Sequence, residues 1–313
     1  MGRLVSLIVA FYNVELFARK CMDSLIRQTY QNLEIICVDD GSTDQTSIIL
    51  DEYLKKDHRV TIFHKENGGL SDARNFGLVH SSGDFVCFVD GDDFITDDYV
   101  ERLVSLQMKY DSDISVLNFS KFDFDSKKIV KNYKKTITTC FDKKEALRTM
   151  LYQNMFDVSA WGKLYKKELF NDIFYPYGKL YEDNGTTYLL ISKANKVSFS
   201  SYVGYYYVQR ANSILSSKFN SKKMDGLELS KNMVRFIECN YSSLKKAAYC
   251  RYVSICFNLL LQTTDENVER RELKNEIKKY RIKIIFDINS RSKTRIACVL
   301  SLFGFRFFKK KGV

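Results

Sequence analysis

The 313-residue chain, with 45% hydrophobic and 28% charged residues, has the composition of a globular protein and the length for one large α/β domain plus a smaller appendage. Its net charge of +11 is uneven, because 13 of the 49 Lys and Arg but only 3 of the 38 Asp and Glu lie in residues 271–313. The near-neutral remainder argues against a nucleic-acid-binding surface on the main body, so we expect no nucleic-acid partner.

Strand and helix signals alternate over the first hundred residues. Short apolar runs predict strands, and apolar residues at helical spacing predict helices. In chain order the predicted elements are strand 4–10, helix 15–28, strand 33–38, helix 43–53, strand 60–63, helix 71–80 with Ser71 as its cap, and strand 85–89. This order predicts a mostly parallel sheet flanked by helices, which binds ligands beyond the C-terminal ends of its strands.

The second half of the chain has weaker signals. Residues 111–139 suggest strands interrupted by a Lys-rich loop around 123–135, and residues 140–215 mix helices with aromatic-rich segments. From about residue 218 the spacing of apolar residues is mainly helical. We therefore expect a main α/β domain over 1–216 and a smaller, mainly helical region over 217–313.

The sharpest chemical feature is the acidic run Asp90-Gly91-Asp92-Asp93 at the end of the fourth predicted strand. Carboxylates two positions apart in a turn can converge on one Mg²⁺ or Mn²⁺ and leave its other positions to phosphate oxygens. The alternative is an acidic turn in which Asp92 or Asp93 caps the next helix. The run alone supports the two interpretations about equally.

Three further motifs have both a functional and a structural interpretation. The run 39–42 (DDGS) ends the second predicted strand, where a carboxylate could bind a nucleobase or ribose, or only cap a turn. The glycine-rich loop 67–75 enters a helix, and its Arg74 could reach a phosphate or a carboxylate. Glu182 and Asp183 precede an apolar helix, where one could act as a general base or both could complement the helix dipole. Taken singly, none of the three favours the functional interpretation.

The motifs become specific because they occur together and in a fixed order. The segments are VSLIVAFYN (5–13), QTY (28–30), VDDGSTD (38–44), ENGG (66–69), SDARN (71–75) and FVDGDD (88–93). In this order they closely resemble the family-2 glycosyltransferases, particularly bacterial capsule and exopolysaccharide enzymes, which implies a GT-A type fold. The resemblance is strong over 4–100, looser through 161–165, 181–183 and 207–210, and absent from 218–313. It departs from the family at Gly91, where relatives often have Ser, and at Asn184, where many have a third acid.

The resemblance assigns roles to single residues by position. Asp40 looks like the uracil-contacting residue with Arg74 as its supporting partner, and Asp183 looks like the catalytic base. Asp90 resembles the ribose and metal-side acid, and Asp92 the direct ligand of Mn²⁺ or Mg²⁺. The expected donor-binding residues are Ala10, Tyr12, Asp40, Asn67, Gly69, Arg74, Asp90, Gly91, Asp92 and Arg210.

Four of the assigned positions lie in the loosely matched part of the chain, the proposed base Asp183 among them. Arg210 resembles a residue of a segment that folds over the diphosphate. Trp161 and Glu182 are expected to shape the acceptor or donor pocket, although a core aromatic is an equally supported interpretation of Trp161.

The implied activity is inverting transfer of a hexose or N-acetylhexosamine from a UDP-sugar to a hydroxyl of a glycan acceptor, expected to be lipid-linked. One alternative is a nucleotidyltransferase, although the first strand ends in 11–13 (FYN) without the Gly-rich loop usual in that class. The other is a non-catalytic nucleotide-sugar-binding partner of a polysaccharide assembly complex, which retention of Asp90, Asp92 and Asp183 argues against.

Cysteines and hydropathy indicate the cellular setting. The eight cysteines include no CxxC pair, and Cys37 and Cys87 lie in apolar runs, so we expect reduced thiols in a cytoplasmic protein. No signal peptide and no run of 18 apolar residues is visible. The three histidines lack metal-ligand spacing, and a homo-oligomer is left open.

The tail combines an apolar stretch with basic flanks. Residues 296–308 hold one charge and are bordered by Arg291, Lys293, Arg295 and the run 309–311 (KKK). The stretch is too short to span a bilayer but could lie in the headgroup layer of an anionic membrane. The alternative is a helix docked on the protein's own core.

Overall fold

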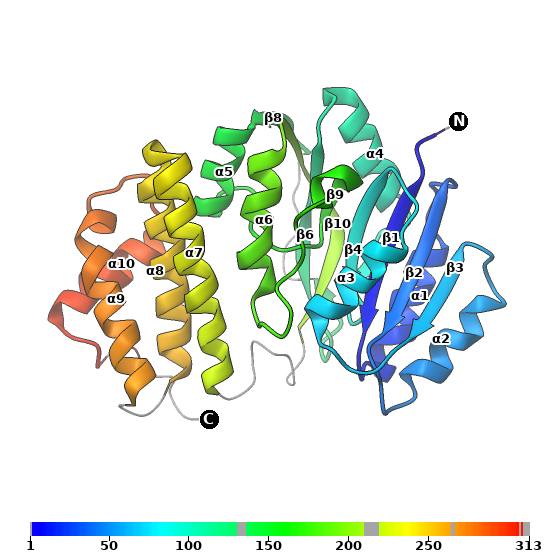
Figure 1. Ribbon diagram of the computed structural model, residues 1–313, viewed down its shortest axis with the longest axis horizontal. Helices are drawn as coiled ribbons and strands as arrows, with labels where there is room; N and C mark the ends of the chain where they lie inside the picture. Colours follow the sequence, from blue (N-terminus) through cyan, green and yellow to red (C-terminus); the bar gives the residue numbers. More distant parts are fainter. Residues whose placement is uncertain (1, 130–135, 210–218, 264–266, 307, 309–313) are drawn as a thin grey trace. The chain divides into compact units, whose positions relative to one another are not determined.

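The computed structural model describes residues 2–129, 136–209, 219–263, 267–306 and 308 (Figure 1). The chain forms two compact units. Unit 1 comprises Met1–Ala146, Ser159–Gly178 and Leu189–Ser213, and unit 2 comprises Leu147–Val158, Lys179–Tyr188 and Ile214–Val313. The boundary predicted near residue 216 lies outside the described residues and stays a prediction.

Unit 1 is built on one mixed sheet. Within the described residues its strands are β1 (Val5–Phe11), β2 (Leu33–Asp39), β3 (Val60–His64), β4 (Phe85–Asp90), β5 (Phe94–Ile95), β6 (Ile114–Asp123), β7 (Lys128–Ile129), β8 (Thr138–Asp142), β9 (Lys163–Lys166) and β10 (Lys196–Gln209). The strand order is β3-β2-β1-β4-β9-β6-β10-β5, with β7 beside β6 and β8 beside β10. The strands β1 to β4 are parallel, as are β6 and β10, while β9 runs antiparallel to β4 and β6. The predicted mostly parallel α/β sheet is confirmed.

Helices cover both faces of this sheet. They are α1 (Glu15–Ile26), α2 (Thr46–Leu54), α3 (Leu70–His80) and α4 (Tyr99–Tyr110), while α5 (Lys143–Tyr152) and α6 (Glu182–Lys193) are divided between the units. Alternate β1 residues such as Val5, Leu7 and Val9 join buried residues of α1, α2 and α4 in one core. Ile8 points to the other face, where α3 packs, and a Cβ on Gly77 would lie 2.3 Å from Cγ2 of Ile8. Glycine at 77 therefore lets α3 approach β1 closely.

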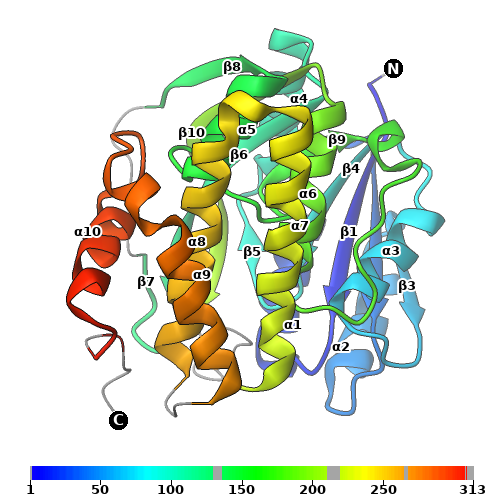
Figure 2. The same ribbon diagram turned by 60° about the vertical axis from the view of Figure 1, so that its left-hand side comes forward.

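Unit 2 is mainly helical, as predicted for the C-terminal region. Its helices are α7 (Asp225–Asn240), α8 (Lys245–Gln262), α9 (Val268–Ile285) and α10 (Ser292–Leu300), with the short turns η2 (Ser221–Met224), η3 (Ser242–Leu244) and η4 (Ser301–Phe303). Helices α7, α8 and α9 run side by side with α8 in contact with both neighbours (Figure 2). Small buried residues on α8, among them Ala247, Ala248 and Cys250, allow this close packing.

A fully buried arginine joins three segments of unit 2. Arg270 on α9 donates from Nη1 to the carbonyls of Leu260 and Thr263 at 2.8 and 2.7 Å, at the end of α8. Its Nη2 donates to the carbonyl of Phe308 at 2.9 Å. A guanidinium that satisfies the unpaired carbonyls at a helix C-terminus also favours the helix dipole. Arg270 therefore satisfies carbonyls at the end of α8 and holds Phe308 in the same place.

Several smaller predictions can be compared with the structure. The seven elements predicted between residues 4 and 89 lie within three residues of their predicted bounds, whereas the short strand β5 was not predicted. Ser71 is not the cap of α3, because the helix begins after Gly69, whose φ of 88° is left-handed, and Ser71 is buried inside the first turn. All eight cysteines fall within the described residues as free thiols, with Cys37 and Cys87 buried. Across the described part of the chain, no helix combines the length and apolar composition needed to cross a bilayer.

Candidate functional site

The strand order of the sheet reverses at β1. The chain first places β2 and β3 on one side of β1 and then returns to place β4 on its other side. In open α/β sheets, ligands bind beyond the carboxyl ends of the strands at such a reversal. The segments that leave β1 and β4 carry the predicted donor residues Tyr12 and 90–92. The C-terminal ends of β1 and β4, which we call the carboxyl edge of the sheet, are therefore the candidate site.

The acidic turn after β4 is fastened to β1 through its backbone. The N–H of Gly91 donates to the carbonyl of Ala10 at 2.9 Å, and the N–H of Asp93 donates to the carbonyl of Asp90 at 2.9 Å. A Cβ at position 91 would lie 2.4 Å from Cδ1 of Phe11 and 2.8 Å from the carbonyl oxygen of Ala10. Because the turn lies this close to β1, only glycine fits at 91, which explains the departure from serine at that position.

Arg74 on α3, expected from the resemblance to support Asp40, is bound to Asp90. Its Nη2 lies 2.6 Å from Oδ1 of Asp90, and the Arg74 side chain is 3% exposed whereas that of Asp90 is 21% exposed. The guanidinium also lies 5.4 Å from the ring centroid of Tyr175. Arg74 therefore orients a partly accessible carboxylate at the strand end.

Asp93 has a role that the sequence did not reveal. It does not cap α4, which begins after Asp98. Instead its buried carboxylate accepts from the hydroxyl of Tyr205 at 2.6 Å and from the N–H of Val208 at 2.7 Å, both on β10. Burial raises the pKa of Asp93 well above its usual range, and the charges of Asp92 and Asp90 raise it further. Asp93 thus ties the acidic turn to β10. One of its two contacts is with Val208, two positions before Arg210 in the sequence.

Asp40 accepts hydrogen bonds from the loop that follows β3. Its buried carboxylate accepts hydrogen bonds from Lys65 Nζ at 2.8 Å, Gly68 N–H at 2.9 Å, Gly69 N–H at 2.7 Å and Asn67 Nδ2 at 3.1 Å. Lys65 lies 2.5 Å from Asp72 as well. These contacts hold the glycine-rich loop against the end of β2, so Asp40 positions the predicted donor residues Asn67 and Gly69. Sequence analysis missed Lys65, whose only signal is its place directly after β3.

Ala10 and Tyr12 lie where β1 ends. Tyr12 is 49% exposed and precedes Asn13, which has a left-handed φ of 49°. The N–H of Asn13 donates to Oγ of Ser42 at 3.1 Å, and Oδ1 of Asn13 accepts from the N–H of Thr43 at 2.8 Å. This turn fixes an accessible aromatic ring beside the segment that follows β2. Such a ring can stack on a nucleobase.

Trp161 belongs to an aromatic stack in unit 1. Its ring lies 4.5 Å from that of Tyr205 with 9° between the planes, and 5.9 Å from that of Tyr207. Phe119 meets it edge to face at 4.8 Å. Trp161 is half-buried and packs against the main core, so it braces Tyr205, the residue that holds Asp93.

The predicted acids Glu182 and Asp183 open α6 in the part of that helix that belongs to unit 2. Tyr181 directly before them has a left-handed φ of 61°. Glu182 is buried, while Asp183 is half-buried and its Oδ1 accepts from the N–H of Asn184 at 2.8 Å. Asp183 therefore occupies the first turn of a helix, where the dipole favours a carboxylate.

Arg251 on α8 is a further residue that sequence analysis missed. Its Nη2 donates to Oδ1 of Asn184 at 2.7 Å. Burial lowers the pKa of Arg251, and the charges of Asp157 and Asp183 oppose that change. The position at which many relatives have a third acid thus carries an amide that accepts from a guanidinium. Arg251 lies outside the segments of family resemblance, so no motif pointed to it.

The predicted metal ligands can be tested for fit. Asp92 is half-buried, and Asp90 is engaged by Arg74 at one carboxylate oxygen. In the described ranges, no group of three or more His, Cys, Asp or Glu side chains is arranged to hold a metal ion. Mg²⁺ is commonly bound through only one or two carboxylates together with substrate phosphates. The pair therefore fits a divalent cation that binds with its nucleotide, and metal binding stays a prediction.

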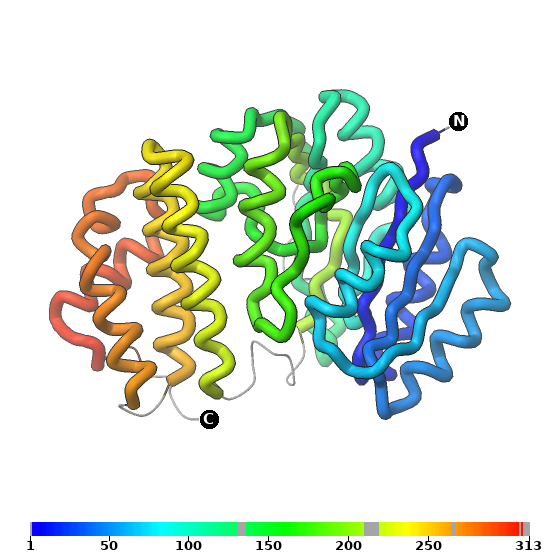
Figure 3. The backbone as a smooth tube through the Cα atoms, viewed as in Figure 1, coloured from blue at the N-terminus to red at the C-terminus, as the bar shows by residue number. Residues whose placement is uncertain are grey.

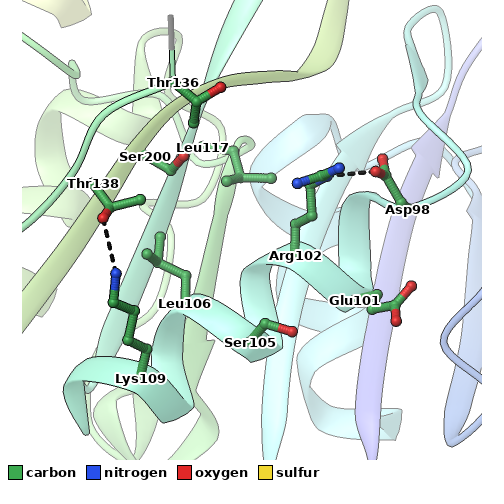
Figure 4. A pocket seen from close by; sticks show the side chains of 10 residues that line it. All are labelled: Asp98, Glu101, Arg102, Ser105, Leu106, Lys109, Leu117, Thr136, Thr138 and Ser200. Atoms are coloured by element: carbon green, nitrogen blue, oxygen red, sulfur yellow. Dashed lines mark hydrogen bonds and ion pairs between the residues drawn. The ribbon is translucent and has the colours of Figure 1, made fainter.

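A pocket of about 410 Å³ lies beside α4, and its lining is shown in Figure 4. Arg102 pairs with Asp98 there and lies 3.9 Å from the ring centroid of Tyr202, while Nζ of Lys109 lies 3.2 Å from Oγ1 of Thr138. None of the predicted site residues lines this pocket. The pocket therefore does not coincide with the candidate donor site. The predicted residue Arg210 lies outside the described residues.

Comparison with known proteins gives consistent matches. Residues 6–174 match the family described as glycosyl transferase family 2. The glycosyltransferase GlyG of Streptococcus pneumoniae is 30% identical over 291 residues, which cover 83% of this chain and 96% of that protein. GlyA of the same species is 40% identical over 210 residues, covering 63% of this chain but only 30% of GlyA. The glycosyltransferase EpsJ of Bacillus subtilis is 34% identical over 216 residues, or 67% of this chain and 62% of EpsJ.

Solved structures share the fold. A fragment of S. aureus TarS, in complex with UDP-GlcNAc, superposes with a TM-score of 0.61 at 20% sequence identity. The superposition covers 96% of this chain and 91% of that fragment. At this identity the likeness concerns the fold alone.

Proposed function

Because the chain belongs to glycosyl transferase family 2 and has a GT-A type fold, we propose that it moves a hexose or N-acetylhexosamine from a UDP-sugar to a hydroxyl of a glycan acceptor. The observation that carries this proposal is made at the C-terminal ends of β1 and β4. There the partly accessible carboxylate of Asp90 is held by the buried Arg74. The glycine-rich loop nearby in unit 1 is held by hydrogen bonds from Gly68 and Gly69 to Asp40. A UDP-sugar donor is supported by TarS, which has the same fold and binds UDP-GlcNAc.

The residues at this edge divide the recognition of the donor among them. Tyr12 stacks on the uracil, and the loop held by Asp40 forms the wall beside the base and ribose. Arg74 keeps Asp90 directed toward the ribose. Asp90 and Asp92 would hold Mn²⁺ or Mg²⁺, and the bound cation would supply charge neutralisation for the departing diphosphate. Arg210 adds a second positive charge for the same phosphates.

We assign acid–base chemistry to Asp183 and expect inversion at the anomeric carbon. Asp183 takes the proton of the acceptor hydroxyl, the acceptor oxygen forms the new bond to the anomeric carbon, and the bond to UDP breaks on the opposite side. The first helical turn of α6 holds this carboxylate through the N–H of Asn184. Glu182 and Trp161 shape the surroundings of the sugars.

We further propose a role in the synthesis of capsule, exopolysaccharide or another cell-surface glycan, which is what the resemblance of the motifs over 4–100 to bacterial capsule and exopolysaccharide enzymes implies. For that role we propose a lipid-linked acceptor at the cytoplasmic face of the cell membrane, with the enzyme bound peripherally. Sedimentation velocity of the purified protein tests whether the enzyme forms a homo-oligomer.

The experiment that tests the function measures UDP release from a panel of UDP-sugars with Mn²⁺ or Mg²⁺, with EDTA, and with oligosaccharide acceptors. We expect one or a few donors to be turned over, activity to vanish in EDTA, and Asp92→Ala to lose most activity while staying folded. Asp97→Ala removes an exposed carboxylate from the same segment and should leave the rate unchanged. Absence of UDP release from every donor, or a wild-type rate for Asp92→Ala, contradicts the proposal.

A further inference from the structure

Helix α10 docks on the other helices of unit 2 along one side. Helix α10 contacts α9 and α8, on the side of the helices opposite to α7 (Figure 3, orange to red). Its docked side carries the buried residues Thr294 and Cys298, and Ser301 and Phe308 are buried beyond it. The carbonyl of Phe308 accepts from Arg270. The apolar stretch 296–308 is therefore neither fully detached nor fully packed in the core.

The opposite side of α10 is apolar and exposed. Residues of an α-helix are spaced by about 100° around its axis, so Ile296, Val299 and Leu300 fall within an arc of about 100° that faces away from Cys298. The large side chains exposed on this arc and next to it are Ile296, Val299, Leu300, Leu302 and Phe303, and the turn between α9 and α10 adds Phe286 and Ile288. We call the five residues from Ile296 to Phe303 the apolar face. A globular protein normally directs such a face inward.

Basic side chains border the apolar face. With the same spacing of about 100° per residue around the axis of α10, Lys293 lies at one edge of the arc and Arg295 at the other. Arg291, Lys293 and Arg306 are exposed. The only acid between residues 277 and 308 is Asp287, which is buried and accepts hydrogen bonds from Tyr152 and Ser290. Within the described residues from 277 to 308, the surface thus offers apolar side chains bordered by positive charge, and the one carboxylate of this range is buried.

We propose that the apolar face of α10 and η4 binds the surface of an anionic lipid bilayer. Large apolar side chains enter the boundary between headgroups and acyl chains, and the Lys and Arg rim pairs with anionic headgroups, which is the pattern of interfacial helices. The helix has nine residues and lies on the bilayer without crossing it. Arg270 and the packing of Cys298 keep the face preformed before the membrane is reached.

A second copy of this chain is a less suitable occupant of the same face. Two copies meeting there would bring Lys293, Arg295 and their equivalents together, and the described part of this segment has no exposed acid to pair with them; juxtaposed like charges oppose association. Anionic lipid headgroups provide the complementary charge over the whole rim. The proposal concerns lipid binding alone and does not depend on glycosyl transfer.

The test is co-sedimentation of the full-length protein with vesicles, carried out without donor or metal. We expect binding to phosphatidylcholine vesicles containing phosphatidylglycerol, little binding to phosphatidylcholine alone, and weaker binding at high salt. The double variant Ile296→Ser/Phe303→Ser should lower the partition coefficient by about tenfold or more. Both side chains are well exposed, at 59% and 79%, so the substitutions leave the fold intact.

Matched control variants distinguish binding through the apolar face from nonspecific adsorption of the protein to vesicles. Ile48→Ser/Val79→Ser removes apolar side chains that are 57% and 70% exposed on unit 1, and it should bind vesicles like the wild type. Lys293→Glu/Arg306→Glu should weaken binding to anionic vesicles more than Lys245→Glu/Lys246→Glu, which changes the net charge equally at the start of α8.

Three results would overturn the proposal. The wild type could fail to bind anionic vesicles at low salt. The Ile296→Ser/Phe303→Ser variant could bind as well as its control. In sedimentation velocity without lipid, the wild type could be a dimer that this double variant makes monomeric, in which case the face is an interface between copies.

Discussion

Arg74 on α3 and Asp90 at the end of β4 form an ion pair with 2.6 Å between Nη2 and Oδ1, in which the arginine is buried and the carboxylate is partly accessible. The pair joins a helix on one face of the sheet to the acidic turn at its carboxyl edge. Because the Arg74 side chain is buried, water cannot take the place of Asp90 if the pair is broken. The pair therefore matters for folding as well as for the site.

Loss of this pair should be costly for stability. Arg74→Gln leaves Asp90 without its cation and a polar amide in a buried position, so we expect the free energy of unfolding to fall by about 3 kcal/mol. Urea denaturation measures the change. Arg19→Gln is the control, because Arg19 and Glu52 form a pair with both side chains largely exposed, so its loss should change the free energy of unfolding far less. Equal losses in the two variants would contradict a structural role for the buried pair.

Gly91 should resist substitution by the serine that relatives often carry. Gly91→Ser places a Cβ against Cδ1 of Phe11 and the carbonyl of Ala10, and we expect a loss of about 1–3 kcal/mol in the free energy of unfolding. The loss should be smaller when Phe11→Leu is already present, since the leucine removes the ring contact. A double-mutant cycle in urea measures this coupling. Additive effects of the two substitutions would show that Phe11 is not the obstacle.

The first hundred residues were predictable because local pattern and fold agree there. Apolar runs such as 33–38 are buried strands, and the acidic motifs lie at strand ends where parallel topology brings them together. The antiparallel β9 was not predictable, because its four residues have no alternation of their own and pair only through tertiary contacts with β4 and β6.

The parts of the site that the sequence did not reveal depend on distant contacts. Asp93 is one acid among several in its turn, and only the position of Tyr205, 112 residues later, shows that it anchors β10. Lys65 and Arg251 have no motif around them and acquire their roles from Asp40 and Asn184. The tail could be described as apolar with basic flanks, but which of its side chains face outward followed only from the docking of Cys298 and Phe308.

Replacement of the proposed base should separate chemistry from donor binding. Asp183→Asn keeps the shape and an Oδ1 that can accept from the N–H of Asn184, but it cannot take a proton. We expect the transfer rate to fall by roughly 10²–10⁴-fold with the Kd for UDP nearly unchanged. Glu182→Gln is the comparison, measured in the same acceptor assay. An inactive Glu182→Gln beside an active Asp183→Asn would mean that the other acid is the base.

His64 should give the stability a pH dependence near neutrality. A hydrogen bond with Asp39 raises the pKa of His64 above its usual 6.5, partial burial opposes this, and the contact with Asp51 adds to it. The folded state therefore binds the proton more tightly than the unfolded state. The stability that this contributes is fully present below about pH 6.5, the pKa of an ordinary histidine. It is lost as the pH rises through the raised pKa of His64 in the folded protein.

Urea midpoints measured from about pH 5.5 to pH 8.5 test this. The wild type should lose more stability across that range than His64→Gln, while His58→Gln, which replaces an exposed histidine, should behave as the wild type does. Identical pH profiles for His64→Gln and the wild type would contradict the role assigned to the contact with Asp39.

The most direct test of the account is the location of the nucleotide, measured by isothermal titration calorimetry with UDP and Mn²⁺. We expect UDP to bind the wild type, Tyr12→Ala to weaken binding about tenfold through loss of base stacking, and Asp92→Ala to weaken it in Mn²⁺. Arg102→Gln, at the pocket beside α4, should leave the Kd unchanged. Failure of UDP to bind, or binding that Arg102→Gln weakens while Tyr12→Ala and Asp92→Ala do not, would contradict a donor site at the carboxyl edge of β1 and β4.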